Sequence, residues 1–478
     1  MKITAQNKPK ISINQRYRLK YHMSAPYGWM NDPNGLVFFK GYYHVFYQFN
    51  PYASSWGPTH WGHFRSKDLI HWESLPLVLI PGKNEDSEGC FSGSAIVKDD
   101  CLYLMYTGHH CNPEDASKFC ETQNIAYSTD GLNFNKYKNN PVIRTPPRDN
   151  THNFRDPKIW RHSGSYYVIL GGQTKEKTGR AIVYRSQNLF EWKYLGPITV
   201  AKSATTQGTM WECPDLFNLG NASILLFSPQ GIQPINDEFL NLYQTGYFIG
   251  DMNYQNNKFK HGNFIELDHG HDFYAAQTLL APDGRRILLG WLGMWETAMP
   301  EKKDNWAGAL TVPRELALIK QHLFMRPVRE LQQLRNSKLF DINTQLLSQK
   351  LDISDPQHVE ITLSFLLKNW HGNSFTFALQ NSKDNFLTLT FCKNSQKITL
   401  YRKGIDPYRY GQISYHDKFK LQVLIDTSSI EFFVNDGETV FSERYYTENE
   451  VGISLGFDIS TLCKLQAYSL KTQDIINF

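Results

Sequence analysis

The sequence predicts an all-β protein in which a five-bladed β-propeller is followed by a C-terminal β-sandwich. Five strand-like runs of similar composition recur at intervals of about sixty residues, which is the size of a propeller blade. Helical periodicity is nearly absent before residue 325, and the repeat stops near residue 345. The chain of 478 residues is also long enough to form two hydrophobic cores.

The repeated runs are rich in aromatic and aliphatic residues, as buried strands are. They are GYYHVFYQ from Gly41, CLYLMYTG from Cys101, SYYVILGG from Ser165, SILLFSP from Ser223 and RILLGWLG from Arg286. Each run follows another strand and a turn, as in NGLVFFKG and PKIWRHSG. Each unit is therefore expected to be an antiparallel meander of several strands.

A second element recurs in step with these runs. It is a turn containing Asp or Asn, followed by an aromatic residue, and it is found in RSKDLIHWE, YSTDGLNFNKY and YRSQNLFEWKYLG. Asp and Asn side chains cap the backbone of such turns. We therefore expect one hairpin at the same position in three blades.

The expected organisation has four parts. Residues 1–20 form an N-terminal extension, 21–325 the propeller, 326–344 a linker and 345–478 the sandwich. The segment VRELQQLR at 328–335 suits a short linker helix. Beyond it, runs such as HVEITLSFLL and KLQVLID alternate apolar and polar residues. FFVNDGETVF predicts a tight hairpin, because Asn-Asp-Gly tolerates positive φ angles.

Composition and charge argue against several classes of partner. The net charge of +4 is small beside 50 basic and 46 acidic residues, so no nucleic-acid partner is expected. No long apolar run suggests a membrane span, and the first twenty residues lack the apolar core of a secretory signal, so we expect a cytoplasmic protein. Seven cysteines without CxxC pairs suggest reduced thiols. A monomer and a homodimer both remain open.

Three acids occupy equivalent places in the repeat. Asp32, Asp156 and Glu212 each lie ten or eleven residues before the recurrent strand of their blade. Taken singly, each suits an ordinary turn at the start of a strand, where Asp-Pro and Pro-Asn-Gly are common. The first strand of every propeller blade lines the central channel, however. Three acids in register are therefore expected to meet in one funnel.

A glycosidase needs two carboxyl groups that flank the sugar bond it cleaves. One protonates the leaving oxygen, and the other attacks the sugar or activates water. Asp32, among the amides of NDPN, is expected to stay ionised at neutral pH. Glu212, between Trp211 and Cys213, is expected to be partly desolvated and suits the acid. The remaining acid can orient sugar hydroxyls.

The strings around these acids resemble the signature set of glycoside hydrolase family 32, which contains invertases, levanases and sucrose-6-phosphate hydrolases. They are WMNDPNG, YQFNP, FSGS, FRDP, WECPD, HDFYAAQ, GWLGMW and LTVPREL, in this order. The resemblance implies that Asp32 is the nucleophile, Glu212 the general acid/base and Asp156 a transition-state stabiliser. It also implies a fructose pocket formed by Trp29, Met30, Asn31, Gln48, Trp56, Phe91, Ser92, Arg155, Tyr274, Trp291 and Trp295.

The expected function is that of a retaining β-fructofuranosidase acting on sucrose 6-phosphate, sucrose or both. An exo-fructanase or a fructosyltransferase of the same family is an alternative. A carbohydrate-binding protein without catalysis is another, because propellers and sandwiches also serve as lectins.

No metal or cofactor is expected. His269 and His271 form a possible metal pair but have no third ligand within sequence reach. The chain also lacks a glycine-rich phosphate loop or a dinucleotide fingerprint that follows a strand and opens a helix. The expected partner is therefore a small sugar substrate alone.

Overall fold

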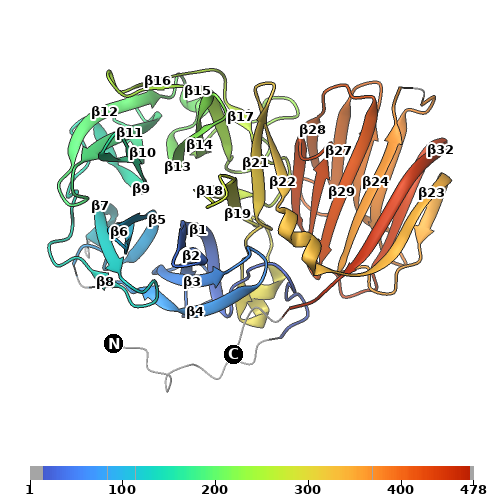
Figure 1. Ribbon diagram of the computed structural model, residues 1–478, viewed down its shortest axis with the longest axis horizontal. Coiled ribbons are helices and arrows are strands. Elements are labelled where there is room, and N and C mark those ends of the chain that lie inside the picture. The colour runs from blue at the N-terminus through green and yellow to red at the C-terminus, as the bar shows by residue number, and fades with distance from the viewer. Residues whose placement is uncertain (1–13, 83, 113–114, 369, 474–478) are drawn as a thin grey trace.

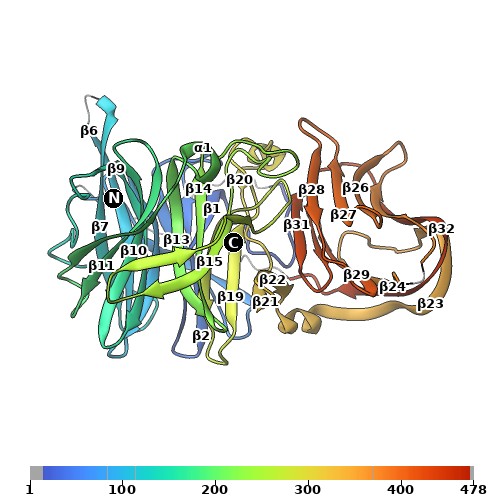
Figure 2. The same cartoon turned by 90° about the horizontal axis from the view of Figure 1, so that it is seen from above.

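The computed structural model describes residues 14–82, 84–112, 115–368 and 370–473, and it confirms the predicted fold. Five sheets, antiparallel except where β20 joins the first, surround a central axis, and a ten-stranded sheet folded into two layers lies beside them (Figure 1). Seen from above, the propeller strands run through the thickness of a disc, and the sandwich extends from its side (Figure 2).

The blades are built from consecutive strands. Blade 1 contains β1 (Gly28–Phe39), β2 (Tyr42–Asn50), β3 (His60–Ser66), β4 (Trp72–Leu79) and the later β20 (Trp306–Ala307); blade 2 contains β5 (Gly89–Lys98), β6 (Cys101–Asn112), β7 (Asp115–Ser128) and β8 (Asn135–Lys136). Blade 3 contains β9 (Asn150–His162), β10 (Ser165–Thr174), β11 (Gly179–Ser186) and β12 (Lys193–Val200); blade 4 contains β13 (Met210–Leu219), β14 (Ala222–Gln230), β15 (Gly246–Asn253), β16 (Lys258–His261) and β17 (Ile265–Glu266). Blade 5 contains β18 (Tyr274–Leu280), β19 (Arg286–Trp291), β21 (Arg314–Ile319) and β22 (His322–Pro327).

The five repeated runs of the sequence form the second strand of each blade, namely β2, β6, β10, β14 and β19. Each pairs with the innermost strand of its blade, namely β1, β5, β9, β13 or β18. The predicted meander is therefore confirmed, and the inner strands face the axis. Helical structure in the described residues is limited to α1 (Ala204–Gln207) and the 3-10 turns η2 (Pro300–Asp304) and η3 (Arg329–Leu334).

The recurrent turn has the same geometry in blades 1, 2 and 3. A side-chain oxygen of Asp68, Asp130 or Asn188 accepts hydrogen bonds from the backbone N–H groups two and three residues later. These turns join the third and fourth strands of their blades. The predicted equivalence of the three turns is thus observed, and Asp or Asn is needed there because its short polar side chain caps the backbone.

The sandwich has its own hydrophobic core. Its strands are β23 (Arg335–Leu351), β24 (Val359–Leu366), β25 (Ser374–Gln380), β26 (Asn385–Cys392), β27 (Lys397–Arg402), β28 (Tyr408–Gln412), β29 (Lys418–Asp426), β30 (Ser429–Val434), β31 (Thr439–Arg444) and β32 (Gly452–Leu470). Asn435, Asp436 and Gly437 all have positive φ angles between β30 and β31, as the predicted hairpin requires.

The segment expected to be a linker, 326–344, is mostly regular structure. The expected short helix is the 3-10 turn η3, and β23 begins directly after it at Arg335, before residue 345. The reason is that β23 pairs along almost its whole length with β32, which recruits these residues into the sandwich.

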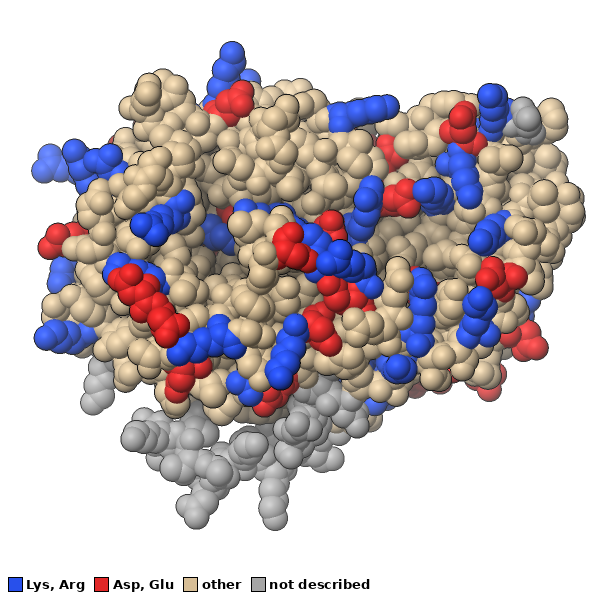
Figure 3. Space-filling view, in the orientation of Figure 1, with Lys and Arg blue, Asp and Glu red and all other residues tan. Residues whose placement is uncertain are grey.

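Charged side chains of both signs are interspersed over the face seen in Figure 3, and neither sign forms one continuous patch. No helix within the described residues is both long enough and apolar enough to span a lipid bilayer.

Candidate active site

The three predicted acids lie together at one end of the propeller axis. Asp32 on β1, Asp156 on β9 and Glu212 on β13 border one cavity of about 260 Å³. Their strands are the innermost strands of blades 1, 3 and 4. The repeat therefore converges in space as the sequence predicts.

A break in strand pairing accompanies each acid. The register shifts between Met30 and Pro33 in β1 and between Glu212 and Asp215 in β13, and β9 shifts opposite Ile169 and Gly171. Proline follows each acid directly or after one residue, and it cannot donate a ladder hydrogen bond. Such bulges redirect side chains. They turn the acids into the cavity.

Asp32 is buried and receives hydrogen bonds from a hydroxyl and an amide, and a weaker one from the Cys213 thiol at 3.8 Å. Ser92 Oγ donates to Oδ2 at 2.7 Å, and Asn31 Nδ2 donates to Oδ1 at 3.0 Å. The pKa of Asp32 is raised to about 6, because burial and the charge of Glu212 outweigh the hydrogen bonds from Ser92, Asn31 and Cys213. Asp32 is thus mostly ionised at neutral pH, as expected, although its surroundings are less polar than NDPN suggested.

Glu212 is held by a cation rather than by an apolar wall. Arg155 donates to Oε1 from Nε at 2.9 Å and from Nη2 at 2.7 Å. Tyr274 donates its hydroxyl to Oε2 at 2.5 Å. Trp211, which was expected to shield the acid, instead packs in the core of its blade against Phe227. A cation and a hydroxyl, rather than the indole of Trp211, therefore surround the Glu212 carboxylate.

Asp156 contacts the backbone beside Glu212. The N–H of Cys213 donates to Asp156 Oδ2 at 2.9 Å, and the Cys213 thiol lies 3.6 Å from the same oxygen and 3.8 Å from Asp32 Oδ2. Burial raises the pKa of Asp156, and the charges of Glu212 and Asp32 act in the same direction. The three carboxylates lie in one small space, where their negative charges repel one another.

The other predicted residues fall into two groups. Those bordering the cavity are Asn31, Gln48, Trp56, Phe91, Arg155, Tyr274 and Trp295, and Ser92 lies directly behind Asp32. Trp29, Met30 and Trp291 are buried and do not border the cavity. Trp29 stacks against Trp295 with 6.1 Å between ring centroids and meets Trp291 edge to face at 5.7 Å, so these indoles support the wall from behind.

Four bordering residues were missed in the sequence, namely His109, Phe119, Glu121 and Asn153. His109 stacks on Phe91 with 4.3 Å between ring centroids and lies 5.2 Å from Phe119. These rings continue the aromatic wall that begins at Trp56, which is half exposed. The sequence signal for His109, Phe119 and Glu121 was weak, because they lie on β6 and β7 and outside the motif strings, whereas Asn153 lies on the innermost strand β9, directly before FRDP.

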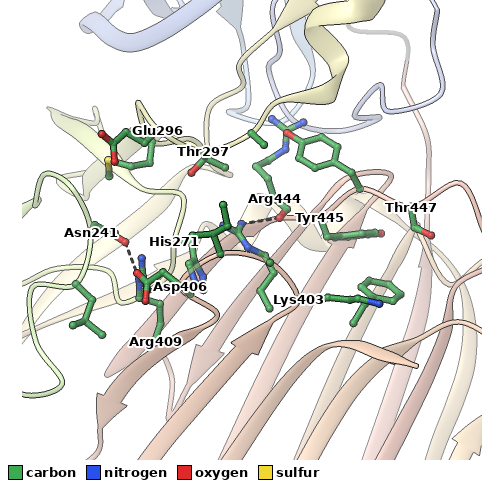
Figure 4. A pocket seen from close by; sticks show the side chains of 18 of the residues that line it. Asn241, His271, Glu296, Thr297, Lys403, Asp406, Arg409, Arg444, Tyr445 and Thr447 are labelled. Atoms are coloured by element: carbon green, nitrogen blue, oxygen red, sulfur yellow. Dashed lines mark hydrogen bonds and ion pairs between the residues drawn. The ribbon is translucent and has the colours of Figure 1, made fainter. Parts of the chain in front are cut away.

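A larger cavity of about 830 Å³ lies between the propeller and the sandwich (Figure 4). Its three arginines are already paired: Arg402 with Asp272, Arg409 with Asp406 at 2.9 Å and Arg444 with Glu301 at 3.1 Å. His271, considered above as a metal ligand, hydrogen-bonds Glu443 at 2.8 Å. Across the described part of the chain, no group of three His, Cys, Asp or Glu side chains is placed to hold a metal ion.

Comparison with known sequences also indicates a glycoside hydrolase. Residues 22–327 match the profile of the glycosyl hydrolases family 32 N-terminal domain, and residues 330–469 match the family 32 C-terminal profile. A sucrose-6-phosphate hydrolase from Escherichia coli is 40% identical over 439 residues, which are 90% of this chain and 89% of that protein.

Solved structures share the whole architecture. A β-fructofuranosidase mutant from Bombyx mori in complex with sucrose has a TM-score of 0.86 and 38% identity, covering 96% of this chain and 95% of its own. A sucrose-6-phosphate hydrolase from Lactobacillus gasseri has a TM-score of 0.87 and 29% identity, covering 97% and 94%. With both domains matched along nearly their full length, the chain belongs to glycoside hydrolase family 32 and is a glycoside hydrolase.

Proposed function

We propose that this enzyme is a retaining β-fructofuranosidase that hydrolyses sucrose 6-phosphate, sucrose or both, releasing fructose and glucose 6-phosphate or glucose. The observation that carries the proposal is that Asp32 and Glu212 border the same cavity and are held by different kinds of partner. Asp32 receives bonds from a neutral hydroxyl and an amide, whereas Glu212 is held by Arg155 and Tyr274. Two carboxylates with different partners in one cavity are the arrangement that a glycosidase needs, and their roles follow from the motifs in which the two acids lie.

In the first step, an Asp32 oxygen attacks the anomeric carbon of the fructosyl group. Glu212 donates a proton to the glycosidic oxygen as its bond to that carbon breaks, and the glucosyl product leaves. Asp32 then carries a fructosyl ester. The hydroxyl of Ser92 and the amide of Asn31 keep the attacking carboxylate oriented.

In the second step, water replaces the leaving group. Glu212, now a carboxylate, takes a proton from this water as its oxygen attacks the anomeric carbon and the ester bond to Asp32 breaks. Free fructose leaves, and Glu212 has regained its proton. Asp156 stabilises both transition states by hydrogen bonding to fructose hydroxyls, from the place where the Cys213 N–H holds it.

Hydrolysis of a small disaccharide is favoured over the other candidates. A lectin needs neither an acid held by Arg155 and Tyr274 nor a second carboxylate with a raised pKa. Relatives named for sucrose 6-phosphate and for sucrose support the substrate class. A phosphorylated substrate also suits action in the cytoplasm, where a sugar phosphorylated during import would be released.

The test is to compare kcat/KM for sucrose 6-phosphate and sucrose by measuring released fructose. We expect sucrose 6-phosphate to be preferred by at least about tenfold, which corresponds to about 1.4 kcal/mol of transition-state binding. Equal values would remove the phosphate from the proposal. Absence of fructose from both substrates would contradict the hydrolase itself.

A further inference from the structure

Arg155 lies between two carboxylates, of which the proposed reaction uses only one. Its Nε and Nη2 donate to Glu212, whereas Nη1 lies 3.3 Å from Glu121 Oε1 and donates to Asn153 Oδ1 at 2.8 Å. Glu121 is on β7, Arg155 on β9 and Glu212 on β13, so the guanidinium links three blades. Its single positive charge is shared between two acids.

This sharing bears on the acid step. A general acid must carry a proton when the substrate is bound. A guanidinium fixed on Glu212 would hold a carboxylate there instead, because an adjacent cation favours the charged form of an acid. Arg155 must therefore loosen its contact with Glu212 before the glycosidic bond breaks.

Glu121 provides a fixed second partner for the guanidinium. It is only 2% exposed, and its Oε2 accepts a 2.5 Å hydrogen bond from the backbone N–H of Phe154. Oε1 also lies 3.7 Å from His109 Nδ1. Burial by itself would raise the pKa of Glu121, but Arg155, His109 and the Phe154 N–H outweigh burial and lower it. Glu121 is therefore charged at neutral pH.

We propose that Glu121 is a positioning residue that draws Arg155 away from Glu212 in the substrate complex, which allows Glu212 to carry the proton needed by the leaving group. This proposal rests on the proposed role of Glu212 as general acid. The other titratable groups that face these side chains are Asp32 on β1, His109 on β6, Asp156 on β9, Cys213 on β13, Tyr243 before β15 and Tyr274 on β18.

The decisive variant is Glu121→Gln, measured as kcat/KM against pH. Without the negative charge of Glu121, Arg155 stays paired with Glu212 alone. The guanidinium then favours the ionised form of Glu212 over the protonated form. The alkaline limb of the profile should therefore move to lower pH by about one unit. A fructosyl donor whose leaving group needs no protonation should lose little activity. Glu121→Asp, which keeps the charge, should return the alkaline limb most of the way to its wild-type position.

Glu296→Gln is the matched control, because it removes the same charge from an exposed position next to Trp295. It should leave the profile unchanged. If Glu121→Gln raises only KM, or lowers activity equally at every pH and with every donor, the positioning role is overturned. Failure of the proposed function is a separate result: Glu212→Ala would then hydrolyse sucrose normally.

Discussion

Clusters of acidic side chains occur in two regions of this molecule, and the regions differ in how far cations balance the negative charge. In the catalytic cavity, Arg155 forms ion pairs with Glu212 and Glu121 and its charge also acts on Asp156, whereas Asp32 is held by the neutral groups of Ser92 and Asn31. The acids outnumber their cation. Burial accordingly raises the pKa values of Asp32 and Asp156.

The second region is the contact between the propeller and the sandwich. Arg314 on β21 binds Glu431 on β30 at 2.5 Å and Asp268 at 2.8 Å. His22 binds Asp426 and Glu431, each at 2.8 Å. Burial opposes ionisation of all three acids. His22 outweighs burial at Asp426, and Arg314 and His22 outweigh it at Glu431, so both pKa values are lowered, whereas burial prevails at Asp268 and raises its pKa.

The difference teaches that burial alone does not make a carboxylate reactive. At Asp426 and Glu431 in the domain contact, cations compensate the buried charge and the acids fix the geometry. In the cavity, compensation is incomplete, and the acids keep proton affinities that are useful near neutral pH. Changes in the first region should therefore affect turnover, and changes in the second should affect stability.

The largest expected effect is that of Asp32→Asn. This variant has no nucleophile, and turnover of every fructosyl substrate should fall by about 10⁴-fold or more. Because it also removes a buried charge, the free energy of unfolding should stay unchanged or increase. Initial rates and urea unfolding test both parts. A clear loss of stability would show that the charge of Asp32 is compensated after all.

Much of this site was predictable, because the repeat gives each blade the same offset. Asp32, Asp156 and Glu212 could be placed on innermost strands from spacing alone. Glu121 could not, because β7 is the third strand of its blade and reaches the cavity only at one end. A charged residue within ETQNIAY carries no sign of that position.

Side-chain direction near the bulges was also beyond sequence reasoning. Alternation along a strand predicts which residues share a face. The register shift between Met30 and Pro33 interrupts that alternation in β1. Trp29 and Met30, which the family resemblance placed in the pocket, are buried behind it. The start of β23 was hidden too, because pairing with β32 is a long-range contact.

The next effect in size is that of Arg314→Met at the domain contact. Removing Arg314 leaves Asp268 buried without its cation and Glu431 with His22 alone, and the free energy of unfolding should fall by about 3–5 kcal/mol. Turnover per folded molecule should change little. Arg326→Met is the matched control on β22, because Arg326 is exposed and donates only to the backbone oxygen of Asp436. Equal urea midpoints for the two variants would contradict the account.

His22→Gln should have a smaller effect that depends on pH. Burial opposes the positive charge of His22, but its bonds to Asp426 and Glu431 outweigh burial and raise the pKa to about 9, from 6.5 in the unfolded chain. This stabilisation is complete below about pH 6.5 and is lost as the pH rises through 9. Urea unfolding should show this decline in the wild type but not in His22→Gln. If the free energy of unfolding depended on pH in the same way in both proteins, the assigned ion pairs of His22 with Asp426 and Glu431 would be contradicted.

The smallest expected change is that of Ser92→Ala, which removes a hydrogen bond to the charged form of Asp32. The pKa of Asp32 should rise from about 6 by about one unit. The acid limb of kcat/KM should therefore move to higher pH. Ser94→Ala serves as the control, because Ser94 on the same strand accepts a bond from the Ile159 N–H. An unmoved acid limb in Ser92→Ala would mean that another group controls it.

The central claim is that Glu212 exchanges protons with the leaving group and with water while Asp32 holds the fructosyl group. Glu212→Ala tests it most directly, with a fructosyl donor whose leaving group needs no protonation. The account predicts a burst of leaving group equal to the enzyme concentration, a fructosyl ester on Asp32, and faster turnover with added azide to give fructosyl azide of retained configuration. Normal sucrose hydrolysis by this variant, or a first product of inverted configuration, would contradict it.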